Sequence, residues 1–328
     1  MKRKLEIFAV LALLAVALTV APAWADSYNF FSFDGPNSGA GTTVNGINNL
    51  DQIVGFSVDA NDNVTNWTRN VNGSFKTLNL PNGSLANGIN FTPTIVGQNG
   101  ANAFVYAGGV YSQLAYVNGS TTAEAAFGIN DVGTIVGQYT DSNTGTSPGF
   151  VYANNQFTIL NPVADDVAVN AQGVNQGGLV TGFYSTDGVH SHGFFYNSSN
   201  KQYQLVADPN MPNFVFSQIL GINDNGLAVG YYGTANGSQH GFLYNINTQQ
   251  YTFLDDPMQG IIGGVSITQI TGIGDDGEIA GFYVGTDGLQ HGFYATDTVP
   301  EPSSLVMLGT GVLGVAGVIR RKVSRQAN

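Results

Sequence analysis

The chain has 328 residues, no cysteine, 44 glycines and a formal net charge of −12. Without cysteine it can form no disulfide, zinc ribbon or thiol nucleophile, so its stability must come from a packed core. Between Asp26 and Thr298 lie three basic and 20 acidic residues, and this net charge of −17 disfavours binding to nucleic acid or to anionic lipid and polysaccharide.

The first 25 residues have the three parts of a secretory signal helix. Lys2-Arg3-Lys4 supplies the positive start, Ile7 to Val20 the apolar run, and Ala23-Trp24-Ala25 a cleavage site with small residues at Ala23 and Ala25. The alternative is an uncleaved membrane anchor, but the apolar run is short and ends in a good cleavage site. We therefore expect residues 1–25 to be removed and the mature protein to begin at Asp26.

A short motif recurs six times in the mature chain. Its clearest copy is GINDVGTIVGQY at Gly128, and the six copies are spaced by 42, 40, 45, 48 and 51 residues. They begin at Gly46, Gly88, Gly128, Gly173, Gly221 and Gly272. A period of this size indicates an array of one supersecondary unit.

Each copy is expected to be a β-hairpin. In the third copy, Gly128-Ile129-Asn130 ends one strand, Asp131-Val132-Gly133 forms the turn, and Ile135-Val136-Gly137 starts the next. The Asp residues of these motifs are interpreted as turn-forming side chains. The second copy has Phe91-Thr92-Pro93 in place of the acidic turn, which predicts a tighter or distorted hairpin.

Two further strand-like pieces complete each repeat. One is Gly-Phe-x-Tyr, as at Gly149 to Tyr152, and the other is a Tyr-x-x-Leu-x-Asp-Pro segment, as at Gln250 to Pro257. The sixth repeat lacks the last piece, but a similar one occurs at Tyr28 to Pro36, ahead of the first repeat. The sequence therefore predicts an all-β fold in residues 26–298: a six-bladed β-propeller closed by the N-terminal strand, with aromatic residues packed between blades. An open β-solenoid is the alternative, but it gives no reason for the displaced strand.

The last thirty residues, 299–328, differ in character. Pro300-Glu301-Pro302 precedes an apolar run from Leu305 to Ile319, and the basic cluster Arg320, Arg321 and Lys322 follows. As a helix the run would be about 22 Å long, short for a hydrocarbon core of about 30 Å, which favours a single, transient membrane helix. The basic cluster would stop transfer on the cytoplasmic side.

This tail resembles the PEP-CTERM sorting signal. The resemblance implies handling by an exosortase-type membrane enzyme in a Gram-negative bacterium that makes exopolysaccharide, with processing near Pro300-Glu301-Pro302 and delivery to the cell surface or the extracellular space. The six Gly-Ile-Asn units and their His-Gly-Phe-x-Tyr pieces resemble the HAF-type extracellular repeat. That resemblance implies location and repetition, and no particular reaction.

Three histidines precede Gly-Phe at the same place in successive repeats: His192, His240 and His291. They could form a shared metal or ligand rim, or each could make the same structural hydrogen bond at a strand start. The second reading is preferred, because equivalent positions on neighbouring blades lie far apart except close to the axis.

Asp59, Asn61 and Asn63 place oxygen ligands at alternate positions, as calcium loops do, but Val64 and Asn70 stand where such a loop has Gly and Glu. These residues are weak calcium candidates. We expect no other cofactor or metal and no catalytic residues.

The sequence thus predicts an exported, non-enzymatic structural or binding module associated with exopolysaccharide. One alternative is a secreted carbohydrate-active or lactone hydrolase with paired carboxylates at the propeller axis. A second is a surface protein–protein adaptor, which a contiguous apolar patch would favour.

Overall fold

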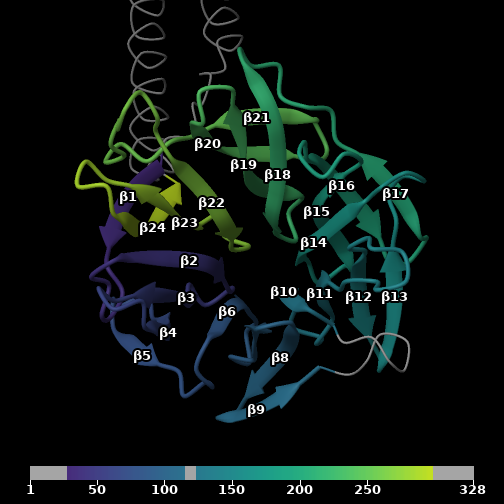
Figure 1. The fold of residues 1–328 in the computed structure, drawn as a ribbon, viewed down its shortest axis with the longest axis horizontal. Coiled ribbons are helices and arrows are strands. Elements are labelled where there is room, and N and C mark those ends of the chain that lie inside the picture. The colour runs from purple at the N-terminus through teal and green to yellow at the C-terminus, as the bar shows by residue number, and fades with distance from the viewer. Residues whose placement is uncertain (1–27, 115–122, 298–328) are drawn as a thin grey trace, which may run out of the picture. The chain divides into compact units, whose positions relative to one another are not determined.

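In the computed structural model, residues 28–114 and 123–297 are described, and Phe30–Thr296 form one compact unit. Its strands make six four-stranded antiparallel sheets arranged as blades around a central axis (Figure 1). The predicted six-bladed β-propeller is therefore confirmed. The signal segment and the membrane helix expected in the tail lie outside the described residues.

The first five blades are each built from four consecutive strands. Blade 1 contains β2 (Gly41–Ile47), β3 (Ile53–Val58), β4 (Val64–Arg69) and β5 (Phe75–Thr77). Blade 2 contains β6 (Ser84–Ile89), β7 (Ile95–Asn99), β8 (Asn102–Ala107) and β9 (Val110–Gln113). Blade 3 contains β10 (Ala125–Ile129), β11 (Ile135–Gln138), β12 (Gly149–Ala153) and β13 (Gln156–Leu160). Blade 4 contains β14 (Ala168–Val174), β15 (Leu179–Ser185), β16 (His192–Asn197) and β17 (Gln202–Leu205). Blade 5 contains β18 (Phe214–Ile222), β19 (Leu227–Thr234), β20 (Gln239–Asn245) and β21 (Gln250–Phe253).

Blade 6 is assembled from both ends of the ring. It contains β22 (Thr268–Ile273), β23 (Ile279–Val284) and β24 (Gln290–Asp297), and its fourth, outermost strand is β1 (Tyr28–Phe33). Phe30 packs on Phe293 with ring centroids 5.1 Å apart, so the closing strand contributes to the core of the blade. The predicted closure by the displaced strand is confirmed.

The core lies between blades. In one cluster, Val151 and Leu160 of blade 3 pack with Val169, Val180 and Phe194 of blade 4. The third strand of every blade provides a fully buried aromatic ring at an equivalent position: Trp67, Phe104, Phe150, Phe194, Phe242 and Phe293. Burying each such ring is worth about 1.5–3 kcal/mol, and no blade can bury it without its neighbour. The expected packing of aromatic residues between blades is confirmed.

The six repeated hairpin turns have the same length. In the third repeat Ile129 pairs with Ile135, and in the second Ile89 pairs with Ile95, so Phe91-Thr92-Pro93 does not tighten its hairpin as predicted. The reason is that the motif asparagine, rather than the residues after it, holds the turn. Asn90 Oδ1 accepts a hydrogen bond from the backbone N–H of Thr94 at 2.9 Å, and Asn130 Oδ1 accepts one from Thr134 at 2.8 Å.

The same asparagines also join neighbouring blades. Asn90 Nδ2 donates to the backbone oxygen of Asn130 at 3.1 Å, and Asn130 Nδ2 donates to that of Asn175 at 2.9 Å. The series is completed by Asn48 to Asn90, Asn175 to Asn223, and Asn223 to Gly274. We call these the asparagine ring. It has five bonds and lacks the sixth, because the sixth repeat has Gly274, which offers no side-chain donor.

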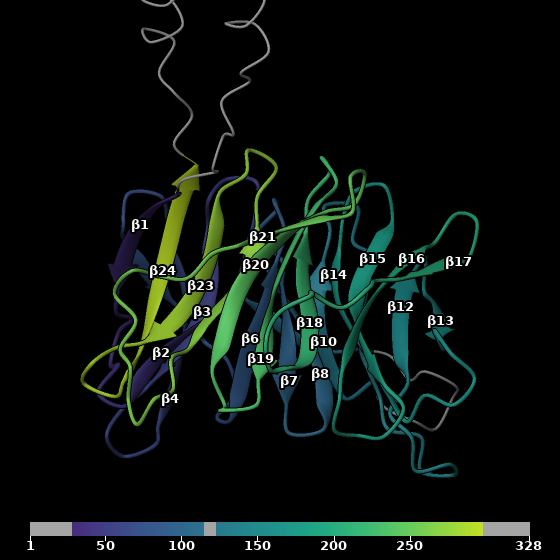
Figure 2. The same cartoon turned by 90° about the horizontal axis from the view of Figure 1, so that it is seen from above.

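The strands run between two faces of the propeller (Figure 2). We call the face with the six motif turns, such as 130–134, the GIN face, and the opposite face, where β2, β6, β10, β14, β18 and β22 begin, the entry face. The innermost strands approach one another closely at the motif glycines. A Cβ on Gly88 would lie 2.6 Å from Phe127 O, so only glycine fits there.

The gap in the asparagine ring predicts a stabilising substitution, Gly274→Asn. A Cβ at this position would lie 3.8 Å from Glu278 Oε2 and 3.9 Å from Asn48 O, both ordinary contacts, and the new amide could donate to Asn48 O. One added hydrogen bond is worth about 0.5–1.5 kcal/mol, so denaturant unfolding should show a stability gain of about that size.

The reciprocal change is Asn130→Ala, which removes one turn bond and one inter-blade bond and leaves a buried carbonyl unpaired. It should cost about 2–4 kcal/mol. If Gly274→Asn destabilised the protein, the missing side chain at residue 274 would not be the reason that the asparagine ring lacks its sixth bond.

Candidate functional site

Every innermost strand has a β-bulge immediately before its motif glycine. In β10 the pairing skips from Ala126 to Gly128, and the other five strands show the same shift. The extra residue makes no ladder pair, and a bulge changes the direction of its side chain. The six bulge residues are Asn45, Asn87, Phe127, Gln172, Leu220 and Thr271.

All six bulge residues line one pocket on the propeller axis, which we call the axial pocket. It has a volume of about 210 Å³ and lies on the entry-face side of the motif glycines. Gln218 and Gln269, two positions before the bulges of β18 and β22, extend its polar wall. Tyr231 and Phe282, from the second strands of blades 5 and 6, add aromatic surface.

Among the described residues, those that line the axial pocket carry no carboxylate, ammonium, guanidinium or imidazole group. Its polar groups are amides and hydroxyls, which both donate and accept hydrogen bonds. Tyr231 is the one titratable lining residue, and burial raises its pKa to about 12, so it stays protonated near neutral pH. The lining is therefore uncharged and rich in groups that can hydrogen-bond to a polar ligand.

Below the axial pocket the channel narrows. The motif residues that follow each glycine form an aliphatic collar around a second cavity of about 70 Å³. These residues are Ile47, Ile89, Ile129, Val174, Ile222 and Ile273. The collar also lines a third cavity of about 60 Å³, which is bounded on the GIN face by polar side chains.

The GIN-face mouth of the channel is acidic. It includes Asp131, Asp224 and Asp275 with Asn49 and Gln176. Asp224 is partly desolvated, and this, with the nearby charges of Asp275 and Asp131, raises its pKa. A hydrolase on this scaffold would need a pair of carboxylates at the propeller axis, and these three aspartates are the candidates for such a pair.

The mouth residues also join the blades, which corrects their interpretation as turn-formers. Asp131 Oδ1 accepts from the backbone N–H of Phe91 in the preceding blade at 2.7 Å, and Asp224 Oδ1 accepts from that of Gln176 at 2.8 Å. Asp275 Oδ1 accepts in the same way from Asp224 at 2.9 Å. The side chain of Phe91, at the equivalent place in blade 2, has no acceptor atom. This second series of bonds therefore lacks the bond from blade 1 to blade 2.

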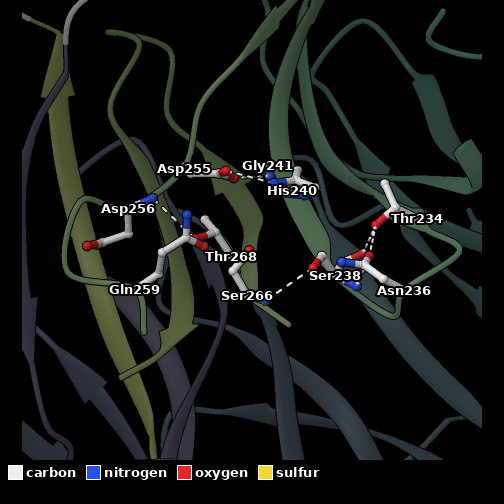
Figure 3. Close-up of polar contacts among 10 residues, drawn as sticks. All are labelled: Thr234, Asn236, Ser238, His240, Gly241, Asp255, Asp256, Gln259, Ser266 and Thr268. Atoms are coloured by element: carbon white, nitrogen blue, oxygen red, sulfur yellow. Dashed lines mark hydrogen bonds and ion pairs between the residues drawn. The ribbon is translucent and has the colours of Figure 1, made fainter. Parts of the chain in front are cut away.

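The repeated histidines lie at the entry face, each beside its own carboxylate. His192 Nδ1 lies 3.0 Å from Asp208 Oδ2, His240 Nδ1 2.7 Å from Asp255 Oδ2, and His291 Nδ1 2.8 Å from Asp34 Oδ1. Figure 3 shows the pair in blade 5, where Asp255 follows the outermost strand and also accepts the backbone N–H of Gly241. Each histidine pairs with a carboxylate of its own blade, and the three histidines do not come together in one cluster.

The next residue, Asp256, lies in the same loop and is fully buried (Figure 3). Its Oδ1 accepts from the backbone N–H of Met258 at 2.7 Å, and its backbone N–H donates to Thr268 Oγ1 at 3.2 Å. Its Oδ2 has no hydrogen-bond partner in the described part of the chain, and burial raises the pKa of this carboxyl. The two adjacent carboxyl groups therefore lie in different environments, Asp255 beside a histidine and Asp256 in the interior.

The calcium candidates form a self-contained loop. Asn63 Nδ2 donates to Asp59 Oδ2 at 2.9 Å, and Asp59 Oδ1 accepts from the backbone N–H groups of Asn63 and Asn61 at 3.0 and 2.8 Å. These bonds lower the pKa of Asp59. Across residues 28–114 and 123–297, no group of three or more His, Asp or Glu side chains is arranged to hold a metal ion. Pro300, Glu301, Pro302, Arg320, Arg321, Lys322, Ala23 and Ala25 lie outside the described residues. The described residues contain no helix that is long and apolar enough to cross a membrane.

Comparison with known families agrees with the sequence prediction for the tail. The family described as the PEP-CTERM protein-sorting motif matches residues 298–322. The match supports export with a transient, membrane-anchored sorting signal and recognition by an exosortase-type system. No curated protein matches the chain.

Several solved structures are similar to this chain at low sequence identity. TolB from Acinetobacter baumannii is 11% identical with a TM-score of 0.45, and the match covers 80% of this chain and 65% of TolB. Aleuria aurantia lectin in complex with Fucα1-6GlcNAc is 11% identical with a TM-score of 0.48, covering 79% of this chain and 93% of the lectin. Oligogalacturonate lyase from Vibrio parahaemolyticus is 12% identical with a TM-score of 0.46, covering 84% and 99%. These similarities concern the fold alone.

The closure of blade 6 should depend on pH through His291. Burial opposes protonation of this ring, but hydrogen bonds to Asp34 and Asp287 outweigh it and raise its pKa above 6.5. A raised pKa means that the stabilisation is fully present below about pH 6.5 and is lost as the pH rises through the folded-state value. Asp34→Asn should therefore cost most stability at about pH 5.5 and less at about pH 8.5 in urea unfolding.

The matched control for this prediction is Asp62→Asn, which removes the same charge from a loop without histidine. A stability difference between the wild-type protein and Asp34→Asn that stays constant across this pH range would contradict the prediction.

The tail match predicts that replacing Pro300, Glu301 and Pro302 by alanine blocks sorting. The protein should then remain in the membrane fraction with its tail attached, whereas the wild-type protein should be shorter and found outside that fraction. Cell fractionation with intact-mass measurement tests this, and Ser303→Ala/Ser304→Ala is the neighbouring control. Equal mass and location for the two variants would refute it.

Proposed function

We propose that this protein is an exported binding module that attaches to a neutral exopolysaccharide through its axial pocket and performs no chemistry on it. The observation that carries the proposal is the composition of that pocket, in which amide and hydroxyl groups stand beside aromatic and aliphatic side chains without any charged group. Sugars present the same combination, because hydroxyl groups at their edges accompany apolar C–H faces. The match to the sorting motif supports delivery to the place where such a polymer accumulates.

The charge of the chain supports a neutral rather than an anionic polymer. Three basic and 20 acidic residues between Asp26 and Thr298 give a net charge of −17. Long-range repulsion would slow the approach of a polyanion, and a desolvated carboxylate in the pocket would find no counter-charge.

The test is co-sedimentation of the purified full chain with insoluble neutral polysaccharide, in calcium and in chelator. We expect saturable retention in both conditions, because no lining residue needs a divalent cation to contact the ligand. Anionic polysaccharide should retain less protein, and the difference should shrink at high salt as repulsion is screened. Absence of retention on neutral polymers at micromolar protein would overturn the proposal.

A hydrolase is the second candidate, and the acidic mouth favours it. The raised pKa of Asp224 beside Asp131 and Asp275 is an arrangement that general acid catalysis can use. Release of reducing ends from the polymer that is lost in Asp224→Asn would establish this alternative. If the binding proposal is right, neither the wild-type protein nor Asp224→Asn will release reducing ends.

A further inference from the structure

We infer that the axial pocket holds a single neutral pyranose unit of the polymer and that the six bulge residues determine which sugar is accepted. This inference rests on the proposed function and adds to it the number of sugar units and the residues responsible for specificity.

The first argument is the contrast between the bulge position and the residues that follow it. In all six repeats the bulge residue is followed by glycine and then by isoleucine or valine, and five repeats continue with asparagine. The bulge position itself holds Asn, Asn, Phe, Gln, Leu and Thr. The uniform residues have structural tasks: close approach of strands, the aliphatic collar and the asparagine ring. A position that varies while all six members face the same pocket is free to be shaped by a ligand.

The second argument is size. A volume of about 210 Å³ is below the roughly 300–1,000 Å³ of pockets for drug-sized ligands, so one small ring fits and an oligosaccharide does not. The cavity below the pocket holds about 70 Å³, roughly two waters at ~30 Å³ each. The aliphatic collar therefore stops the ligand, and the polymer presents a terminal or branching unit rather than threading through the ring.

The third argument is hydrogen-bonding capacity. Asn45 Nδ2 donates to Ala86 O at 3.0 Å, and Asn87 Nδ2 donates to Ala126 O at 3.0 Å. These bonds to the next blade hold both amides in place before any ligand arrives, which lowers the entropic cost of binding. Gln172 is partly exposed in the pocket, and its amide has no hydrogen-bond partner among residues 28–114 and 123–297.

The pocket lining also contains apolar side chains, which complement the face of a sugar ring. Leu220, Tyr231 and Phe282 come from blades 5 and 6, and Phe127 comes from blade 3. Tyr231 is kept in place by its hydroxyl, which donates to Gln218 Oε1 at 2.8 Å. The pocket thus offers hydrogen-bonding amides and apolar surfaces that together match one pyranose, and no group that would stabilise a uronate.

The experiment measures binding of single methyl glycosides to the full chain by ligand-observed NMR and calorimetry. The probes are neutral hexosides, deoxyhexosides and N-acetylhexosaminides, with methyl glucuronide as the charged comparison. We expect at least one neutral glycoside to bind saturably and the glucuronide to bind at least tenfold more weakly.

Three variants test the pocket. Gln172→Ala should weaken binding of the preferred glycoside about tenfold, and Gln172→Trp should abolish binding by filling the pocket. Gln202→Ala, on the exposed outermost strand β17, removes the same amide elsewhere and should leave binding unchanged. Circular dichroism and thermal unfolding confirm that each variant is folded.

The outcomes separate this inference from the proposed function. If the wild-type protein and Gln172→Trp sediment equally with neutral polymer and no glycoside binds, the inference and the axial location of the site are wrong, while binding of neutral polymer stands. If the wild-type protein retains no polymer and binds no glycoside, both are wrong. Equal binding of the glucuronide would overturn the neutral-sugar class alone.

Discussion

The rest of this propeller depends on the two hydrogen bonds made by the side-chain amide of each motif asparagine. Its oxygen closes the turn of its own hairpin and its nitrogen bonds to the backbone of the next blade, as Asn130 does with Thr134 and Asn175. Because Asn130 is only 3% exposed, losing either bond would leave a polar group buried without a partner. One residue therefore couples the local turn to the spacing of blades around the axis, and the same six-fold geometry places the bulges that shape the axial pocket.

The arrangement divides the chain into positions with structural tasks and positions without them. Motif glycines allow the inner strands to approach, the following isoleucine or valine fills the collar, and the asparagine joins the blades. The residue just before the glycine sits in the bulge, pairs with nothing in the ladder and points to the axis. Asn45 and Asn87 also bond to the next blade from this position, but its residue type differs among the repeats, so a binding surface can be built there without disturbing the asparagine ring.

The acidic residues are kept apart from this surface. At the GIN face Asp131, Asp224 and Asp275 accept backbone N–H groups of neighbouring blades, and at the entry face Asp208, Asp255 and Asp34 pair with histidines. The chain can carry a large negative charge because its carboxylates have such partners or lie in solvent. The axial pocket is left uncharged, and the contrast between its lining and the surrounding surface favours neutral ligands over charged ones.

The sequence by itself determined the repeat, its four strands, the closure by Tyr28 to Phe33 and the sorting tail, because periodicity, turn residues and apolar runs are local patterns. It also indicated that His192, His240 and His291 would each make the same structural bond. Only the tertiary structure decided that the motif asparagines form a ring, that Asp131 bonds to blade 2 rather than to its own turn, and that Asn45, Asn87, Phe127, Gln172, Leu220 and Thr271 meet at one pocket. Those contacts join residues about 40 to 50 positions apart, and the bulge that directs six unlike side chains to one axis is a property of strand pairing, which a single repeat does not reveal.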